Sequence, residues 1–251
     1  MPDPERRSKP MHTDQIPPDY VPLSVPGLPT LYGPNSAWRV WLAALPLPAT
    51  SRLRGAGALA ASKGHARHDR LAQDGEVIAI FENDDGSGEQ PAPMMIAAAR
   101  WLLDHDAAFH RAVVDAMLAD LPRLRAEQDG IVLDDDAFRL PPHWDEQTLL
   151  TLIRLNSITF HPVDGGPYIG LDLRCAWDDE HGYGLMMAGT DVIETGGADV
   201  GSLSWIAARH ATSWARANSA RPVVHLADAA ESVEPLPRLR RSARFRSKTW
   251  F

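Results

Sequence analysis

Hydrophobic and polar positions alternate most regularly in the segment 168–177. Its apolar members stand at every second position, and they are Ile169, Leu171, Leu173, Cys175 and Trp177. A period of two predicts a β-strand that buries one face and leaves the other face partly exposed to water. Cys175 belongs to the buried face, so we interpret its thiol as a packed side chain and not as a nucleophile.

Three more strands are predicted around this one. The segment 157–161 precedes it across Pro-Val-Asp-Gly-Gly, a sequence that is typical of a hairpin turn. The segments 183–188 and 191–194 follow it and are separated from each other by Gly-Thr. Consecutive strands with short connections favour an antiparallel meander.

Helical periodicity dominates the middle of the chain. A buried strand is predicted over 75–84, and helices then extend from Ala92 to about Arg125. One helical face repeats an apolar residue at every fourth position, at Phe109, Val113, Met117 and Leu121. We expect Asp106 to cap a second helix inside this range, which gives a helical hairpin or a kinked long helix. Asp145 is expected to cap a short third helix.

Helices and strands occupy separate parts of the chain, which predicts the α+β class. We expect an antiparallel β-meander with helices packed on one face, in a single domain over 36–230. Nine prolines in residues 1–35 predict a flexible Pro-rich arm. Residues 231–251 are expected to form a basic C-terminal tail. The segment 36–45 fits either a short strand or a short helix, and a further helix is predicted over 203–217.

Charge is distributed unevenly over the 251 residues. The net charge is −8, yet the segment 238–251 contains six basic residues and no acidic one. The rest of the chain therefore has 19 Lys and Arg against 33 Asp and Glu, a net charge of −14. A body this acidic favours a basic protein partner. Nucleic acid is expected to contact the chain only through tail residues, namely Arg238, Arg240, Arg241, Arg244 and Arg246.

The cysteine content and the length of the apolar segments indicate the cellular compartment. One cysteine excludes an internal disulfide and a thiolate zinc cluster, so the fold does not depend on an oxidising compartment. The first residues lack the apolar run of a secretory signal, and no apolar window is long enough to span a bilayer. We expect a cytoplasmic protein without membrane contact.

Candidate chemistry gathers in the segment 177–184, Trp-Asp-Asp-Glu-His-Gly-Tyr-Gly, which we expect to form a loop between two strands. The candidate binding residues are Trp177, Asp178, Asp179, Glu180 and His181. The favoured interpretation is structural or partner-facing, because Asp and Gly suit tight strand connections. The alternative is catalytic, with Glu180 and His181 as an acid–base pair and Asp178 or Asp179 orienting the imidazole.

A metal site in this segment would require ligands from elsewhere in the chain. The available candidates are His161, Asp164, His210 and His225, and the sequence leaves their distances from the segment open. We expect neither a metal nor a cofactor.

Two stretches carry a family resemblance: YIGLDLRCAWDDEHGYGL (168–185) and VIETGGAD (192–199). They are similar to a bacterial domain-of-unknown-function family with a Trp-Asp-Glu-Glu-His-Gly-like signature, in which Asp179 stands where Glu is more common. The similarity extends over about 75–201. The family resembles the immunity proteins that are encoded beside polymorphic toxins, so the resemblance implies an immunity-like role.

These observations favour a binding protein over an enzyme. We expect a non-enzymatic, immunity-like protein that engages and neutralises a partner, such as a basic toxin, through its acidic surface. The first alternative is a hydrolase that uses the Asp-Asp-Glu-His loop. The second alternative is nucleic-acid contact through the basic tail.

Overall fold

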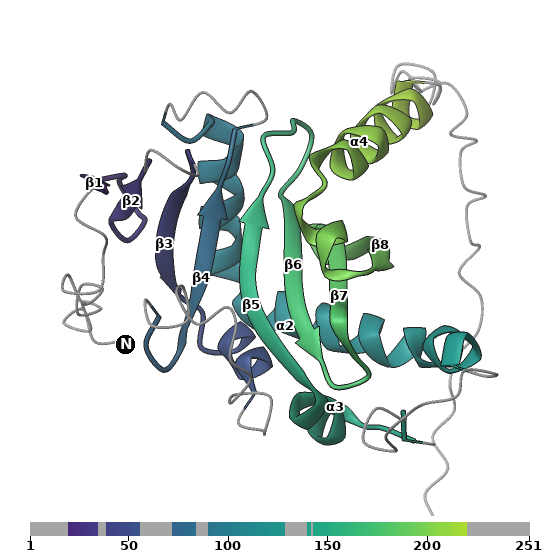
Figure 1. Cartoon of the computed structure of the whole chain (residues 1–251). Coiled ribbons are helices and arrows are strands. Elements are labelled where there is room, and N and C mark those ends of the chain that lie inside the picture. Colours follow the sequence, from purple (N-terminus) through teal and green to yellow (C-terminus); the bar gives the residue numbers. More distant parts are fainter. Residues whose placement is uncertain are drawn as a thin grey trace, which may run out of the picture. The chain divides into compact units, whose positions relative to one another are not determined.

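An eight-stranded sheet forms the centre of the computed structural model (Figure 1). The structure describes residues 20–34, 39–55, 72–83, 90–128, 140–141 and 143–219. The strands follow one another across the sheet in chain order, and every neighbouring pair is antiparallel except β4 and β5. Together with the helices of the described residues, this sheet confirms the predicted α+β class.

The elements have the following bounds. The strands are β1 (Val21–Leu23), β2 (Leu31–Gly33), β3 (Trp41–Pro46), β4 (Glu76–Phe81), β5 (Ile153–Phe160), β6 (Tyr168–Cys175), β7 (Asp178–Ala188) and β8 (Asp191–Gly196). The helices are α2 (Pro93–Gln128), α3 (Glu146–Leu152) and α4 (Ser204–Ser219), with short 3₁₀ helices η2 (Thr50–Arg54) and η5 (Ala198–Ser202). The segment 36–45 is compatible in sequence with a short strand or a short helix, and its described part forms the strand β3.

The meander β5–β8 confirms the strands predicted for the second half of the chain. Ile169 of β6 lies opposite Phe160 of β5 and opposite Met187 of β7. Strand β5 begins at Ile153, four residues before the predicted start at Ser157. The register of β5 shifts between Leu155 and Ser157, and this bulge interrupts the alternation from which the start was predicted.

Strands β4 and β5 form the one parallel pair of the described sheet, with Ala79 opposite Ile158. A parallel pair needs a long crossover connection, and here the crossover contains α2 and α3. The sequence predicted β4 and β5 as strands but did not predict that they are neighbours. The short helix α3 has the predicted cap, because Asp145 accepts the backbone N–H of Thr148 at 2.8 Å.

Helix α2 is a single kinked helix, the second of the two predicted alternatives. His105 has φ −121° and ψ 16°, and its Nδ1 lies 2.7 Å from the carbonyl oxygen of Trp101. A side chain that enters the carbonyl ladder is a known cause of a kink. The predicted helix cap at Asp106 is wrong. Its carboxylate accepts the backbone N–H groups of Ala49 and Thr50, at 2.7 and 2.8 Å, and therefore caps the start of η2.

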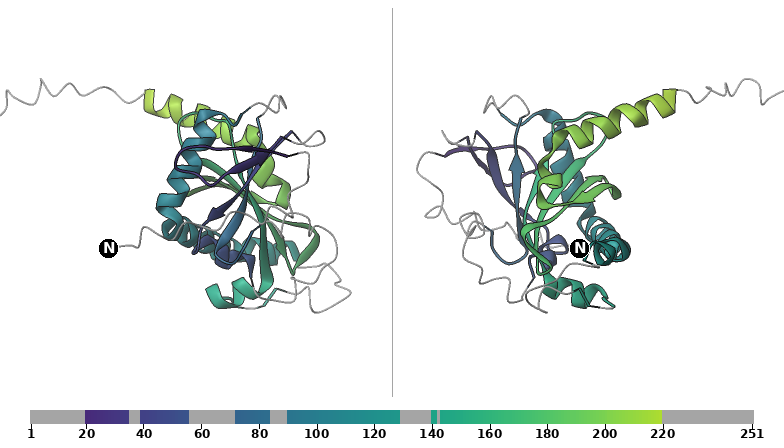
Figure 2. Two further views of the ribbon diagram at one scale, coloured as in Figure 1. Left: turned by 90° about the vertical axis from the view of Figure 1, so that its left-hand side faces the viewer. Right: turned by 45° about the vertical axis from the view of Figure 1, so that its right-hand side comes forward.

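Hydrophobic side chains pack on both faces of the sheet. The face toward α2 contains the larger core, in which Phe109 of α2 and Leu171 of β6 are fully buried. This confirms the predicted packing of the helical segment 92–125 on the apolar face. On the opposite face, Met186 of β7 packs against Ile206 of α4 in a smaller cluster. The left view of Figure 2 shows α2 on one side of the sheet and η5 on the other.

The described part of the Pro-rich segment belongs to the sheet. Strands β1 and β2 pair antiparallel at its first edge, and Leu31 of β2 is fully buried. The flexible arm predicted for 1–35 therefore does not extend over 20–34. Pro22 is compatible with β1 because an edge strand needs hydrogen-bond partners on one side only. Residues 1–19 and 220–251, including the tail arginines, lie outside the described residues.

The described helices do not meet the requirements of a membrane span. None of them is both long enough and apolar enough to cross a bilayer.

Candidate functional site

A groove of about 670 Å³ opens beside the β6–β7 turn. Its described lining comes from α2, from the turn, from β7 and from the junction of β8 with η5. The lining residues are Arg123, Leu124, Glu127, Gln128, Trp177, Asp178, His181, Gly182, Tyr183, Gly196, Gly197 and Asp199. Three candidate residues from the sequence, Trp177, Asp178 and His181, thus line one hollow.

The acidic segment is the beginning of a strand and not a loop. Strand β6 ends at Cys175, residues 176–177 form the turn, and β7 begins at Asp178. The predicted loop is therefore wrong, because Asp178 pairs with Cys175 directly after the turn. The thiol of Cys175 is buried and donates to the carbonyl oxygen of Asp178 at 3.4 Å, so the interpretation of a packed thiol is confirmed. Gly182 permits this register, since it has φ +65° and a Cβ there would lie 2.6 Å from the carbonyl oxygen of Leu173.

Asp178 and His181 form a local pair at the rim of the groove. Oδ1 of Asp178 accepts the backbone N–H of His181 at 2.8 Å and lies 3.2 Å from its Nδ1. An ionised carboxylate only accepts hydrogen bonds, so Nδ1 is the protonated nitrogen in this contact. The side chains are 68% exposed for His181 and 38% exposed for Asp178. Asp178 thus orients the imidazole, and it does so in contact with water.

The remaining acidic candidates are not brought into the groove in the described part of the chain. Glu180 is exposed and is not among the lining residues. Asp179 lies in β7, and its side chain is outside what the structure describes. The catalytic alternative combines Glu180 and His181 as an acid–base pair with Asp178 or Asp179 orienting the imidazole. Of these contacts, the described residues show the one between Asp178 and His181.

The further metal-ligand candidates lie apart from the groove. Nε2 of His161 donates to the carbonyl oxygen of Gly201 at 3.0 Å, and Nδ1 of His210 lies 3.2 Å from the hydroxyl of Tyr168. Asp164 is in the exposed β5–β6 turn, and His225 is outside the described residues. Among the residues that the structure describes, no three His, Cys, Asp or Glu side chains are grouped as metal ligands.

Trp177 is half-buried and forms a wall of the groove. Its ring meets Trp144 edge to face with a centroid distance of 5.1 Å, and it meets Tyr183 in the same manner at 6.0 Å. Aromatic pairs of this geometry restrict ring orientation and add to the free energy of burial. Trp177 therefore presents a fixed aromatic surface to the groove.

A hydrogen-bond network beneath the groove fixes α2 to β7 and β8. Oδ2 of Asp120 accepts the hydroxyls of Tyr183 at 2.7 Å and Thr195 at 3.1 Å. Arg123 donates to both oxygens of Asp120, at 2.7 and 2.6 Å. Burial would raise the pKa of Asp120, but the hydrogen bonds from Arg123, Tyr183 and Thr195 outweigh it and hold the pKa below its ordinary value. Burial and the bond to Asp120 raise the pKa of Tyr183, so the phenol stays a protonated donor.

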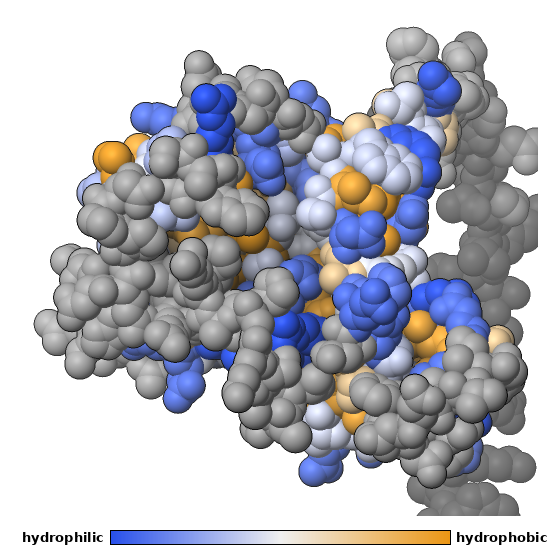
Figure 3. All heavy atoms as spheres, viewed as in Figure 1, coloured by the Kyte–Doolittle hydropathy of each residue, from blue (hydrophilic) through white to orange (hydrophobic). Residues whose placement is uncertain are grey.

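The groove has a negative charge balance. Among the described residues that line it, three carboxylates (Glu127, Asp178 and Asp199) stand against the single guanidinium of Arg123. Nη1 of Arg123 donates to Glu127 at 2.6 Å while its other nitrogens bind Asp120, so its charge is already paired. Asp178 and Asp199 have no Lys or Arg partner in the described part of the chain. On the face seen in Figure 3, the surface over β7 and β8 is mixed, with small hydrophobic patches among hydrophilic side chains.

Close backbone packing holds η5, and with it Asp199, against the sheet. Gly170 of β6 faces Gly201, and Gly184 of β7 faces Gly197, at distances that leave no room for a Cβ on either strand. The hydrogen bond from His161 to the carbonyl oxygen of Gly201 adds a polar contact at the same place. These glycines therefore determine where the carboxylate of Asp199 lies relative to β7.

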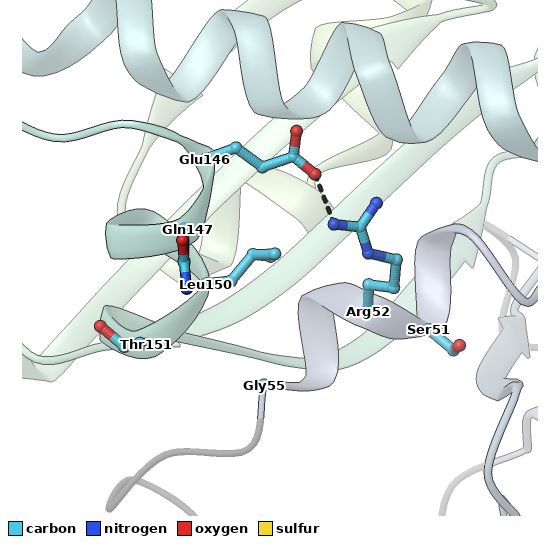
Figure 4. Close-up of a pocket in the computed structure, with 7 residues that line it drawn as sticks. All are labelled: Ser51, Arg52, Gly55, Glu146, Gln147, Leu150 and Thr151. Carbon is cyan, nitrogen blue, oxygen red and sulfur yellow. Dashed lines mark ion pairs between the residues drawn. The ribbon is translucent and has the colours of Figure 1, made fainter.

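A second hollow, of about 820 Å³, lies between η2 and α3. Figure 4 shows Arg52 reaching from η2 toward Glu146 of α3, and the two side chains meet at 2.7 Å. His110 and Arg111 of α2 also contact this carboxylate, each at 3.3 Å. The hydrogen bond from His110, followed by the charges of Arg52 and Arg111, lowers the pKa of Glu146 despite its partial burial. Because side chains of η2 and α2 contact one carboxylate of α3, we interpret this cluster as structural, holding the three elements together.

Sequence reasoning missed the network around Asp120. The available signal was Tyr183, which alternates with Leu185 and Met187 on the buried face and has a hydroxyl that needs a partner. Its partner Asp120 is 63 residues away in the chain, and Thr195 is 75 residues from Asp120. No local pattern connects positions so far apart.

Comparison with known proteins places the groove inside a family domain. Residues 65–203 match the model of a family described as a domain of unknown function, DUF6985. The match spans more than half of the 251 residues and includes the range 75–201 over which the resemblance extends. Neither the curated proteins nor the solved structures give a significant match. The chain therefore belongs to the DUF6985 family of domains of unknown function.

Proposed function

We propose that this protein is a non-enzymatic binding protein that engages a basic partner protein through the groove. The observation that carries the proposal is the charge balance of the groove, in which Arg123 is already paired while Asp178 and Asp199 have no Lys or Arg partner in the described part of the chain. The sequence resemblance supports an immunity-like form of this role, in which the bound partner is a toxin of basic charge.

The net charge of the chain and the aromatic side chain of Trp177 both favour this role. The net charge of −14 outside the tail extends a negative field around the molecule, and such a field speeds encounters with a basic partner and rejects acidic ones. Aromatic side chains at the centre of an interface supply most of its binding free energy. Trp177 stands among the acidic lining residues and is fixed by Trp144 and Tyr183.

The test combines cell rescue with an affinity measurement. The candidate partner is the product of a gene adjacent to the gene of this chain, and it is expressed alone and together with this chain. A groove variant removes three charges through Glu127→Gln, Asp178→Asn and Asp199→Asn, changes that keep the size and the acceptor oxygen. A matched control removes the same charge at three exposed acids outside the groove lining, through Asp104→Asn, Asp164→Asn and Asp191→Asn.

The proposal predicts that the wild-type chain and the control variant rescue the cells and bind the partner. The groove variant should fail in both assays while retaining the wild-type melting temperature. Equal rescue by both variants would contradict a role for the groove, and absence of binding by the wild-type chain would contradict the immunity-like role.

A second candidate function rests on the contact between Asp178 and His181. A carboxylate that orients an imidazole through Nδ1 leaves Nε2 available for general acid–base chemistry, as a hydrolase requires. Its test is hydrolysis of ester and phosphodiester substrates by the wild-type chain and by His181→Ala. Turnover that disappears in His181→Ala would favour the hydrolase, and equal rates in the two proteins would eliminate it.

A further inference from the structure

We propose that β8 pairs with β8 of a second copy of this chain, so that the two sheets continue across a symmetric dimer. Strand β8 is the last strand of the sheet, and in the described part of the chain no strand pairs with its outer side. The backbone N–H and C=O groups on that side of an edge strand can bind another strand. Such a dimer does not depend on the partner binding proposed for the groove.

The two edges of the sheet differ in their capacity to pair. At the first edge, β1 has only three residues, and Pro22 at its centre has no N–H to donate. At the last edge, β8 has six residues and contains no proline. Short strands and prolines are devices that protect an edge from pairing with another chain. The first edge therefore has two protections that the last edge lacks.

Exposed hydrophobic side chains accompany β8 on both faces of the sheet. Val192 is 38% exposed and lies opposite Met187, whose side chain belongs to the core on the α2 face. On the other face, Arg209 of α4 binds Glu194 of β8 and stacks on Trp205, which is 52% exposed. A strand added to β8 would contact Val192 on one face, with Trp205 nearby on the other face.

The side chains of β8 divide between these two faces. Thr195 joins Val192 on the α2 face, because its hydroxyl binds a carboxylate of α2. Ile193 packs in the smaller cluster on the opposite face, and Glu194 lies opposite Met186 of that cluster. The register shift at this point is a β-bulge, which allows the neighbouring side chains of Ile193 and Glu194 to share a face.

This distribution selects one antiparallel register for two copies of β8. With the two-fold axis between Ile193 and Glu194, these two residues lie opposite each other, and Val192 lies opposite Thr195. Each pair then joins side chains on the same face, as a pleated sheet requires. A shift by one residue would set Val192 opposite Glu194, on the other face, or would set Glu194 opposite Glu194.

Charge does not oppose the selected register. Glu194 of each copy is paired with Arg209 of its own α4 and lies opposite the uncharged Ile193. Asp191, the other acidic residue of β8, lies opposite Gly196. Like charges directly opposite each other destabilise a strand pair, and this register of β8 contains none. Because β8 is self-complementary, a second copy fits this edge, as a two-fold dimer requires.

Sedimentation velocity of the full chain over a wide range of concentration tests the dimer. The variant Val192→Lys places a charge on the edge at an exposed position, and circular dichroism verifies its fold. Val21→Lys is the matched control, because it makes the same change on the other edge of the sheet, where Val21 is 59% exposed. Val192→Thr keeps a β-branched side chain at the tested position.

The wild-type chain, Val21→Lys and Val192→Thr should form an increasing fraction of dimer as concentration rises. Val192→Lys should weaken dimerisation by at least about ten-fold, because the substitution acts at two symmetric positions of the interface. Amide hydrogen exchange of the wild-type chain, followed by mass spectrometry, should slow in the β8 peptide as concentration rises and should stay constant in the β1 peptide.

A wild-type chain that stays monomeric at every concentration would overturn the proposal. A dimer that forms equally well in Val192→Lys would overturn it too, as would a dimer in which exchange slows in other peptides but not in β8. If Val192→Lys does not fold, the exchange measurement on the wild-type chain still decides between these outcomes.

Discussion

Gly170→Ala tests whether close packing of η5 on the sheet builds the groove. A Cβ on Gly170 would lie 2.8 Å from the Cα of Gly201, and closer still to its carbonyl group. The nearest atom is the carbonyl oxygen of Gly201, at 1.6 Å. Heavy atoms that are not bonded pack at about 3.5 Å or more, so η5 would have to move away by about 2 Å. The atoms of Gly201 that would clash with this Cβ all belong to the backbone, so no side-chain rotation relieves the clash.

The expected cost of Gly170→Ala has two parts. Overpacking of this kind costs about 1–3 kcal/mol. Movement of Gly201 also weakens the buried hydrogen bond from His161, which is 3.0 Å long, and an unsatisfied buried group costs about 1–3 kcal/mol. We therefore expect the free energy of unfolding to fall by about 3–5 kcal/mol and the melting temperature to fall by about 10 °C.

Thermal and urea unfolding followed by circular dichroism would measure this change. Gly166→Ala is the matched control, because a Cβ there meets only Tyr168, at 3.9 Å, and its cost should be below about 0.5 kcal/mol. A Gly170→Ala protein as stable as Gly166→Ala would refute the account of how η5 positions Asp199.

Further predictions concern side chains at the groove and at the caps. Trp177→Ala should lower the free energy of unfolding by about 2–3 kcal/mol, since the ring is only half-buried, while His181→Ala and Glu180→Ala stay within about 0.5 kcal/mol in the same melts. Asp120→Asn should cost about 2–3 kcal/mol at neutral pH. Because the folded-state pKa of Asp120 lies below its ordinary value of 3.8, this stabilisation is complete above pH 3.8 and is lost as pH falls through the folded-state pKa. The stability difference between wild type and Asp120→Asn should therefore shrink in acid, and a difference that is constant with pH would contradict the ionised network. Asp106→Ala should cost about 1–2 kcal/mol through the lost cap of η2, whereas exposed Asp104→Ala on the same helix should cost nothing measurable.

The sequence predicts the meander because its signals are local. Alternation over 168–177 gives β6, and Asp-Gly-Gly gives the hairpin, where Gly165 has φ +99°. The start of β5 could not be predicted, because the bulge near Asn156 breaks the period of two. The pairing of β4 with β5 is also not local, since the whole crossover separates the two strands.

The N-terminal strands illustrate the limit of composition. Nine prolines in residues 1–35 predict an extended arm, yet Leu31 is fully buried in β2. Proline content excludes a central strand but not an edge strand, and the edge is where β1 lies. Amino-acid composition does not predict whether a single residue such as Leu31 is buried.

The site was predictable in part. The sequence predicts Trp177, Asp178 and His181 as site residues because aromatic and charged side chains gather at the end of an apolar strand. All three line the groove. Glu180 is singled out for the same reason but lies outside the lining. The register shift between Leu173 and Cys175 interrupts the alternation of β7, so Asp178 shares the groove with His181 and not with Glu180. Asp199 could not be linked to the groove from sequence, since its position depends on the close contact of η5 with the sheet.

The affinity of the chain for the adjacent gene product, measured at two salt concentrations, tests the central claim most directly. The account predicts that binding weakens as salt rises and that the groove variant Glu127→Gln/Asp178→Asn/Asp199→Asn loses at least about ten-fold in affinity. It predicts that the control variant Asp104→Asn/Asp164→Asn/Asp191→Asn, with the same net charge, binds like the wild type. Equal affinities for the groove and control variants would contradict the claim that this groove is the binding surface.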